Sequence, residues 1–279
     1  MVSAGIIAAL AAATALPIGP VAAAKPQRIM SMSLCADLLL LQLVPRERVA
    51  SVTYLTPDAA AAVIPGGVHG LAINYGTAED ILKFRPDLIL AGDYSTPVTR
   101  RLAKRVGAPL IEVATVNDFA GVRAVVRQVA RAVGEPGKGE ALVARMDADL
   151  AQLASRPLAR TRRVVAWSGG TSIPGKGSLP NTIIEAAGAV NIAAAPGAAS
   201  ATFGIEQLLM ADPDALLFGA AKGDRPSLVG LEGKHRVVRR AFAGRSIAYN
   251  EVVFSCGLPQ SATAAVDLRR ALDRLPVRR

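Results

Sequence analysis

The chain has 279 residues, of which 51% are hydrophobic, and it carries a formal net charge of +10. This composition suffices for one large or two ordinary globular domains and excludes an intrinsically disordered chain. Only 4% of the residues are aromatic, and the basic residues are dispersed without a nucleic-acid-binding motif. The charge therefore predicts solvated basic faces and no nucleic-acid partner.

The first 24 residues contain no charged side chain. An apolar, alanine-rich run from Gly5 to Leu16 is followed by two prolines and by Ala22-Ala23-Ala24, directly before Lys25. This order is typical of a secretory signal with a small-residue cleavage site, and the run is too short to cross a bilayer comfortably. We expect residues 1–24 to be a signal peptide and the exported chain to start near Lys25.

Residues 25–135 alternate between short apolar runs and amphipathic segments. This alternation predicts strands and helices in turn, and hence a parallel sheet covered by helices. The expected strands are Arg28–Met32, Val49–Val52, Leu88–Ala91 and Leu110–Val113, and the expected helices are Ala36–Leu43, Ala78–Phe84, Val98–Val106 and Phe119–Val133.

A single long helix is predicted over Pro136–Ser155, because apolar residues recur there at helical spacing and Pro157 prevents continuation. About 20 residues at ~1.5 Å per residue give a rod of about 30 Å. We expect this rod, residues 136–156, to join an N-terminal lobe of residues 25–135 to a C-terminal lobe of residues 157–279. The alternative is a helix packed inside one domain.

The same alternation returns after the rod. The expected strands are Arg163–Trp167, Ala215–Phe218 and Ser246–Tyr249, and the expected helices are Thr182–Ala187, Glu206–Met210, Leu228–Phe242 and Ala262–Leu275. The predicted fold class is therefore α/β, with two doubly wound lobes.

An internal repeat supports two lobes of one architecture. Residues 79–92 read EDILKFRPDLILAG and residues 206–219 read EQLLMADPDALLFG, with Glu, Leu, Pro-Asp, Leu and Gly at the same positions. Pro-Asp ends each helix and sets the turn into a strand. Glu79 and Glu206 have no such structural task beyond a favourable charge in the first helical turn, which is the alternative reading of both.

In open α/β sheets, ligands bind outside the carboxyl ends of the strands. Much of the aromatic content of this chain falls in loops at those positions, together with small polar residues. We expect a ligand between the lobes to contact Ser33, Leu34, Cys35, Tyr54, Tyr75, Asp93, Tyr94, Trp167, Ser168, Phe203, Tyr249 and Phe254.

Cys35 and Cys256 lie in opposite predicted lobes. A bond between them would oppose any opening of the lobes, so two separate thiols are expected, with a disulfide as the alternative. The two cysteines and two histidines lack the spacing of a metal site, so no protein-built metal centre is expected.

Residues 169–178, GGTSIPGKGS, partly match a phosphate-binding loop. Gly177 stands where a hydroxyl is required, and Pro180 delays the following helix, so no nucleotide site is predicted. No serine lies in a nucleophile turn and no catalytic pair is expected.

Several segments together resemble the periplasmic substrate-binding proteins of ABC importers for ferric siderophores and cobalamin. They are PQRIMSMSLCADLLLLQLV, YGTAEDILKFRPDLILAG, GEPGKGEALVARMDADLAQL, GSLPNTIIEAAGAVNIA and FGIEQLLMADPDALLFG. The resemblance implies a class III periplasmic-binding-protein-like fold, in which one rigid helix joins two lobes around a shallow cleft. In that family a glutamate on each lobe contacts arginines of the membrane permease, and the matching positions are Glu79 and Glu206.

The resemblance implies a monomeric periplasmic receptor without cofactor or catalytic activity. It would capture an iron siderophore or a related metal chelate and deliver it to the permease dimer of an ABC transporter at the inner membrane. Arg236, Arg239 and Arg245 are candidate donors to an anionic chelate. The alternatives are a cobalamin receptor of the same family, a chelatase-like enzyme on a two-lobed α/β fold, and an exported interaction protein without a small ligand.

Overall fold

The computed structural model describes residues 24–61, 63–93, 96–167, 172–194, 200–202, 204–219 and 234–276. In chain order the first lobe consists of β1 (Ile29–Ser31), α1 (Leu34–Leu43), a 3-10 turn (Arg46–Arg48), β2 (Val49–Thr53), α2 (Thr56–Ala60), β3 (Ile73–Asn74), α3 (Ala78–Phe84), β4 (Leu88–Gly92), α4 (Pro97–Arg105), β5 (Leu110–Val113) and α5 (Phe119–Ala132). Its five strands form a parallel sheet in the order β3-β2-β1-β4-β5. All their carboxyl ends therefore lie at one edge.

The second lobe repeats this plan. It consists of β6 (Arg163–Ala166), β7 (Ser172–Pro174), α7 (Leu179–Ala186), β8 (Val190–Asn191), β9 (Ser200–Thr202), α8 (Ile205–Ala211), β10 (Ala215–Gly219), α10 (Arg236–Ala241), β11 (Ser246–Tyr249), α11 (Glu251–Ser255) and α12 (Gln260–Asp273). Four strands form a parallel sheet in the order β11-β10-β6-β8, while β7 and β9 pair antiparallel beside it.

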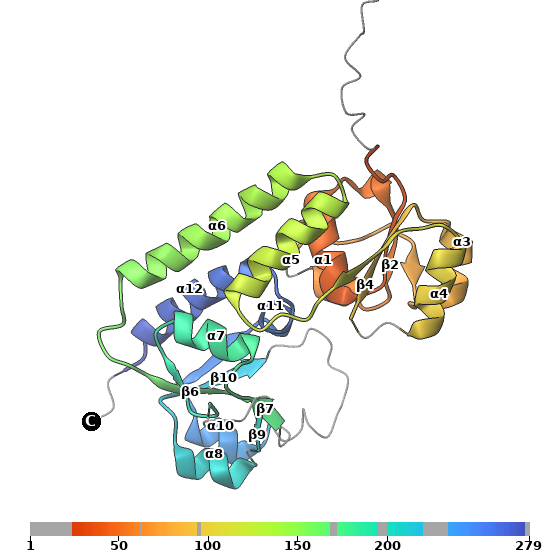
Figure 1. The fold of residues 1–279 in the computed structure, drawn as a ribbon. Helices are drawn as coiled ribbons and strands as arrows, with labels where there is room; N and C mark the ends of the chain where they lie inside the picture. Colours follow the sequence, from red (N-terminus) through yellow and green to blue (C-terminus); the bar gives the residue numbers. More distant parts are fainter. Residues whose placement is uncertain are drawn as a thin grey trace, which may run out of the picture.

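The long helix α6 spans Pro136–Ser155, the bounds predicted from the sequence. In Figure 1 it runs along one side of the molecule from the first lobe toward the second, with α5 and α12 beneath it. Gly139 allows the close approach to α5, because a Cβ there would lie 2.4 Å from the Cβ of Ala130. The predicted fold class, two α/β lobes joined by one long helix, is confirmed.

The lobes also share their interior. One apolar cluster includes Leu90 of β4, Met146 of α6, Val164 of β6 and Ala265 of α12. The helix α6 is therefore both the connection between the sheets and part of a common core. Among the described helices, none combines the length and the apolar character that crossing a bilayer requires.

Candidate functional site

The carboxyl edge of the first sheet holds a pocket of about 250 Å³. It is lined by Met32, Ser33, Leu34, Thr53, Tyr54, Leu55, Tyr75, Gly76, Thr96 and Thr99. Four of the predicted ligand contacts, Ser33, Leu34, Tyr54 and Tyr75, therefore come together here. Thr96 and Thr99, at the start of α4, were not among the predicted contacts, although both follow β4 within a few residues.

Two tyrosines form an exposed aromatic surface at this pocket. The rings of Tyr54 and Tyr75 stack with centroids 5.4 Å apart and an interplanar angle of 22°. Their side chains are unusually open for aromatic residues, with 53% of Tyr54 and 70% of Tyr75 exposed. Because the pair stays exposed instead of entering the core, it offers an apolar face to a ligand.

The backbone beneath Tyr75 is fixed by polar side chains. Asn74 donates through Nδ2 to the Ser31 carbonyl oxygen at 2.8 Å and accepts at Oδ1 from the Gly76 N–H at 3.0 Å. Asp80 accepts from the N–H of Tyr75 at 2.9 Å. Gly76 has φ of +73°, a conformation that side-chain-bearing residues rarely adopt. The Tyr75 turn is thus held from both sides.

The backbone that carries Tyr54 rests on a buried carboxyl group. Asp37 of α1 accepts through Oδ2 from the backbone N–H of Thr53 at 2.8 Å and from its hydroxyl at 2.6 Å, and also from the hydroxyl of Thr56. Burial raises the pKa of Asp37 to about 6, against the hydrogen bonds from Ser31, Thr53 and Thr56, which lower it. With a pKa of about 6, the carboxyl group of Asp37 therefore titrates beneath the backbone that leads into Tyr54.

The two glutamates of the internal repeat occupy equivalent sites. Each is exposed in the first turn of a seven-residue helix, Glu79 in α3 and Glu206 in α8. Both helices end where β4 or β10 begins, so their first turns lie toward the carboxyl edges of the two sheets. The caps are made by neighbours: Thr77 and Asp80 cap α3, and Gln207 accepts from the Gly204 N–H at 3.0 Å. A capping hydrogen bond therefore does not account for either glutamate.

The second lobe departs from the predicted site. Trp167 is only 1% exposed and packs in a core with Val165, Leu216 and Phe242, so its predicted contact with a ligand is wrong. Trp167 follows β6 directly, but its side chain faces the helices that cover the sheet. Arg245 is also unsuitable as a ligand donor, because it binds Asp212 Oδ1 at 2.8 Å and lies over the Phe242 ring.

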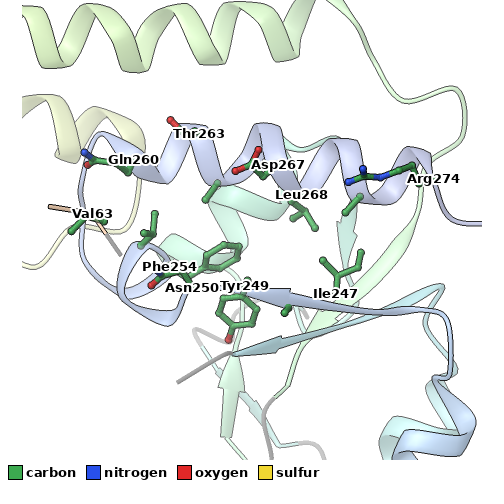
Figure 2. A pocket seen from close by; sticks show the side chains of 14 residues that line it. Val63, Ile247, Tyr249, Asn250, Phe254, Gln260, Thr263, Asp267, Leu268 and Arg274 are labelled. Atoms are coloured by element: carbon green, nitrogen blue, oxygen red, sulfur yellow. The ribbon is translucent and has the colours of Figure 1, made fainter. Parts of the chain in front are cut away.

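Tyr249 and Phe254 line a different pocket of about 480 Å³ between β11 and α12. Figure 2 shows their rings side by side beneath α12, with Asn250, Gln260 and Asp267 around them, and their centroids are 4.3 Å apart. Among the described residues, Val63 alone reaches this pocket from the first lobe, and none of them lines both this pocket and the tyrosine pocket. The structure therefore separates two residues that the sequence placed in one cleft.

Asp93 does lie at the carboxyl edge of the first sheet, but its carboxylate is engaged. It accepts from the Thr115 N–H at 3.1 Å and thereby ties the end of β4 to the loop after β5. The remaining predicted contacts, Tyr94, Ser168 and Phe203, lie outside the described residues.

A disulfide joins the lobes. Cys35, near the start of α1, is bonded to Cys256, directly after α11, with their Cα atoms 5.1 Å apart. The expectation of two separate thiols is wrong, because both segments pack against the shared core. Beside the bond, Gly257 lies so close to Val116 that a Cβ on it would meet Cγ2 at 1.9 Å. The seam between the lobes is therefore covalently closed and tightly packed.

Further contacts cross the same seam. Gln260 of α12 donates to Gln42 of α1 at 2.6 Å, and Thr182 of α7 donates to the carbonyl oxygen of Asn117 at 2.8 Å. Cys35 and Ser33 also line a small cavity of about 110 Å³ with Ser255 and Gly257. Wide opening of the lobes would break all of these contacts. Within the described residues, no group of three or more His, Cys, Asp or Glu is placed to hold a metal ion.

A model of the family described as periplasmic binding protein matches residues 37–248. No curated protein matches the chain. Among solved structures, the chain is similar to the periplasmic heme-binding protein RhuT from Roseiflexus sp. RS-1, with 25% identity, a TM-score of 0.71, and coverage of 88% of this chain and 98% of that one.

Two further solved structures share the fold at lower identity. The periplasmic vitamin B12 binding protein BtuF of Vibrio cholerae has 18% identity and a TM-score of 0.64, over 89% of this chain and 97% of that one. The periplasmic heme binding protein HutB of Vibrio cholerae has 17% identity and a TM-score of 0.69, over 88% of this chain and 98% of that one.

Proposed function

The chain belongs to the periplasmic binding protein family, and we propose that it is a receptor that captures a metal chelate and delivers it to an ABC importer. The observation that carries the proposal is the exposed, stacked pair of Tyr54 and Tyr75 over a pocket at the carboxyl edge of the first sheet. The relatives described above as heme or vitamin B12 binding proteins support a ligand of this chemistry, because both ligands are metal chelates.

The pocket suits one part of a large ligand. Its volume of about 250 Å³ is below the roughly 300–1,000 Å³ of sites that enclose whole drug-sized molecules. We expect one side of an iron siderophore or related chelate to stack on the tyrosines. Ser33, Thr96 and Thr99 line the same pocket and would supply polar contacts to the rim of the chelate. A cobalamin receptor is the second candidate, and the vitamin B12 binding relative favours it.

Delivery would use the two exposed glutamates. Glu79 and Glu206 lie one on each lobe, in equivalent first turns, and neither is used as a helix cap. Charge-assisted contacts of both with cationic groups of a permease dimer would fix the orientation of docking. We further propose that residues 1–24 direct export, that the mature receptor works in the periplasm as a monomer, and that it catalyses no reaction.

The ligand proposal is tested by binding of the chain from Lys25 onward to a panel of ferric siderophores, hemin and cyanocobalamin. The variant Tyr54→Ala/Tyr75→Ala should raise the Kd for the bound chelate by about 10- to 100-fold, because it removes both stacking faces. The matched control is Tyr249→Ala, which alters the pocket between β11 and α12. If the control variant loses affinity and the double variant does not, the site is assigned to the wrong pocket.

The docking proposal is tested with Glu79→Gln/Glu206→Gln. We expect unchanged chelate affinity and loss of ligand-stimulated ATPase activity of the reconstituted importer. Glu47→Gln/Glu185→Gln is the control, because it removes the same charge from two other exposed glutamates, of which Glu47 precedes β2 at the opposite edge of its sheet. Full stimulation by the Glu79/Glu206 variant would contradict the docking role.

The chelatase-like enzyme makes a different prediction. An enzyme would convert metal and free macrocycle into the chelate with multiple turnovers, whereas a receptor binds the finished chelate stoichiometrically. Incubation with a divalent metal and a free porphyrin, followed by absorbance, separates the two. Turnover would refute the receptor proposal, and one-to-one binding of the chelate would support it.

A further inference from the structure

The helices that carry the two docking glutamates are short and shallowly anchored. Each has seven residues, which is too short to be stable by itself in water. Only one apolar side chain is buried in each, Ile81 in α3 and Leu208 in α8, while Leu82 and Met210 are largely exposed. Phe84 of α3 and Ile205 and Leu209 of α8 add partly buried contacts to the neighbouring cores. The polar contacts at the helix ends restrict the direction of each short helix further.

In the first lobe, one arginine holds the carboxyl end of α3. Arg28, directly before β1, donates through Nη2 to the carbonyl oxygen of Phe84 at 2.6 Å and through Nε to that of Arg85 at 3.1 Å. Its backbone N–H donates in turn to Asp87 Oδ1 at 2.9 Å. Because Arg28 leads directly into β1, the end of α3 is fixed to the central strand of the sheet.

The second lobe repeats this contact. Arg163, the first residue of β6, donates through Nη2 to the carbonyl oxygen of Ala211, the last residue of α8, at 3.1 Å. Its backbone N–H donates to Asp214 Oδ2 at 2.7 Å. Phe84 and Ala211 are both the final residues of their helices, so the two arginines grip the same atom in the two copies.

The backbone at these helix ends is unusual in both copies. Within the described residues, Arg85 and Asp212 are the two non-glycine positions with positive φ, at 44° and 38°. Such a conformation is unfavourable for residues with a side chain and persists where surrounding contacts hold it. A guanidinium at a helix carboxyl end also satisfies open carbonyl groups and interacts favourably with the helix dipole.

We propose that Arg28 and Arg163 are positioning residues for docking: each orients the short helix that presents a docking glutamate, so that the two carboxylates match the permease simultaneously. This inference rests on the proposed role of Glu79 and Glu206. The arginines do not contact the ligand pocket, since neither lines it. Their proposed effect on docking passes through the helices α3 and α8.

The test compares Arg28→Gln/Arg163→Gln with the conservative Arg28→Lys/Arg163→Lys. In the Gln variant we expect the concentration of loaded receptor that half-stimulates the importer ATPase to rise at least about tenfold, while the chelate Kd changes less than about twofold. Lysine keeps an N–H donor group and the positive charge near the helix end, so the Lys variant should recover much of the loss. The control Arg101→Gln/Arg240→Gln removes two exposed arginines of α4 and α10 and should leave stimulation unchanged.

Amide hydrogen exchange gives a readout that needs neither ligand nor permease. Peptides covering 78–84 and 205–211 should exchange faster in the Gln variant and at the wild-type rate in the control. Unchanged exchange would overturn the positioning role. An equal loss of stimulation in the control would overturn it too, because bulk charge would then be the cause. If the Glu79→Gln/Glu206→Gln variant stimulated the ATPase fully, the proposed docking would be refuted. The hydrogen-exchange result would still show whether the arginines hold α3 and α8.

Discussion

Removal of the Cys35–Cys256 disulfide should weaken the fold substantially. The bond links two residues separated by 221 positions in the sequence, so it restricts the unfolded chain to conformations in which these residues stay together. The chain-entropy expression for a loop of this length gives about 5 kcal/mol at 25 °C. Domains are stabilised by only about 5–15 kcal/mol in total, so the loss is a large part of the whole.

The variant Cys35→Ser/Cys256→Ser serves the test better than reduction, because it leaves no thiol to re-form the bond or pair between molecules. Equilibrium unfolding in urea, followed by circular dichroism, gives the free energy of unfolding of both proteins. The serine variant should fold at low urea with its midpoint clearly below that of the wild type. The slope of the transition should rise as well, because the unlinked chain exposes more surface when it unfolds.

Two outcomes would refute this reasoning. One is a difference of less than about 1 kcal/mol in the free energy of unfolding between the serine variant and wild-type protein that mass spectrometry shows to contain the bond. It would mean that the unfolded chain is compact even without the disulfide. A wild-type protein whose two thiols both react with a thiol reagent under native conditions would mean that the lobes are not covalently joined. Chelate affinity measured on the same samples shows whether the closed seam matters for binding.

Three further predictions follow from buried contacts. Because the pKa of Asp37 is raised from 3.8 to about 6, the folded protein binds a proton that the unfolded chain has released, and stability should fall by about 3 kcal/mol as pH rises from about 4 to about 6. Asp37→Asn should flatten this part of the pH profile of urea unfolding, and an unaltered profile would contradict the assignment. Gly257→Ala should lower the free energy of unfolding by about 1–3 kcal/mol, because the new Cβ would meet Val116 at 1.9 Å. Gly137→Ala in the first turn of α6 is the control: its Cβ would meet nothing within 4 Å, so thermal melts should show equal or higher stability. Trp167→Phe should lower the melting temperature and leave chelate affinity unchanged; a large loss of affinity would restore Trp167 to the ligand site.

The architecture was readable from the sequence because its signals are local. The helical spacing and Pro157 set the bounds of α6, and the repeat around Pro86-Asp87 and Pro213-Asp214 identified two related lobes. Each of these features is a pattern within a short segment, or a comparison of two such segments. Their meaning does not change with the tertiary context.

The errors arose where packing between distant segments decides. Trp167 follows a strand like Tyr54, but only the structure shows that its side chain turns into the core of the second lobe. Likewise, the sequence places Cys35 and Cys256 in different lobes, and nothing in their neighbours reveals that α1 and α11 meet. Tyr249 is the last residue of β11, as expected, but its side chain lines the pocket beneath α12 and not the pocket of the tyrosine pair.

The apolar cluster that runs from β4 through α6 to β6 and α12 also limits how this protein can be divided or engineered. If the chain were divided at α6, each half would expose the apolar surface that is now buried against the other half. Although the two lobes share one plan, their common core should make them unfold together in one cooperative transition. New specificities are therefore better sought by exchanging surface loops than by shuffling whole lobes between relatives.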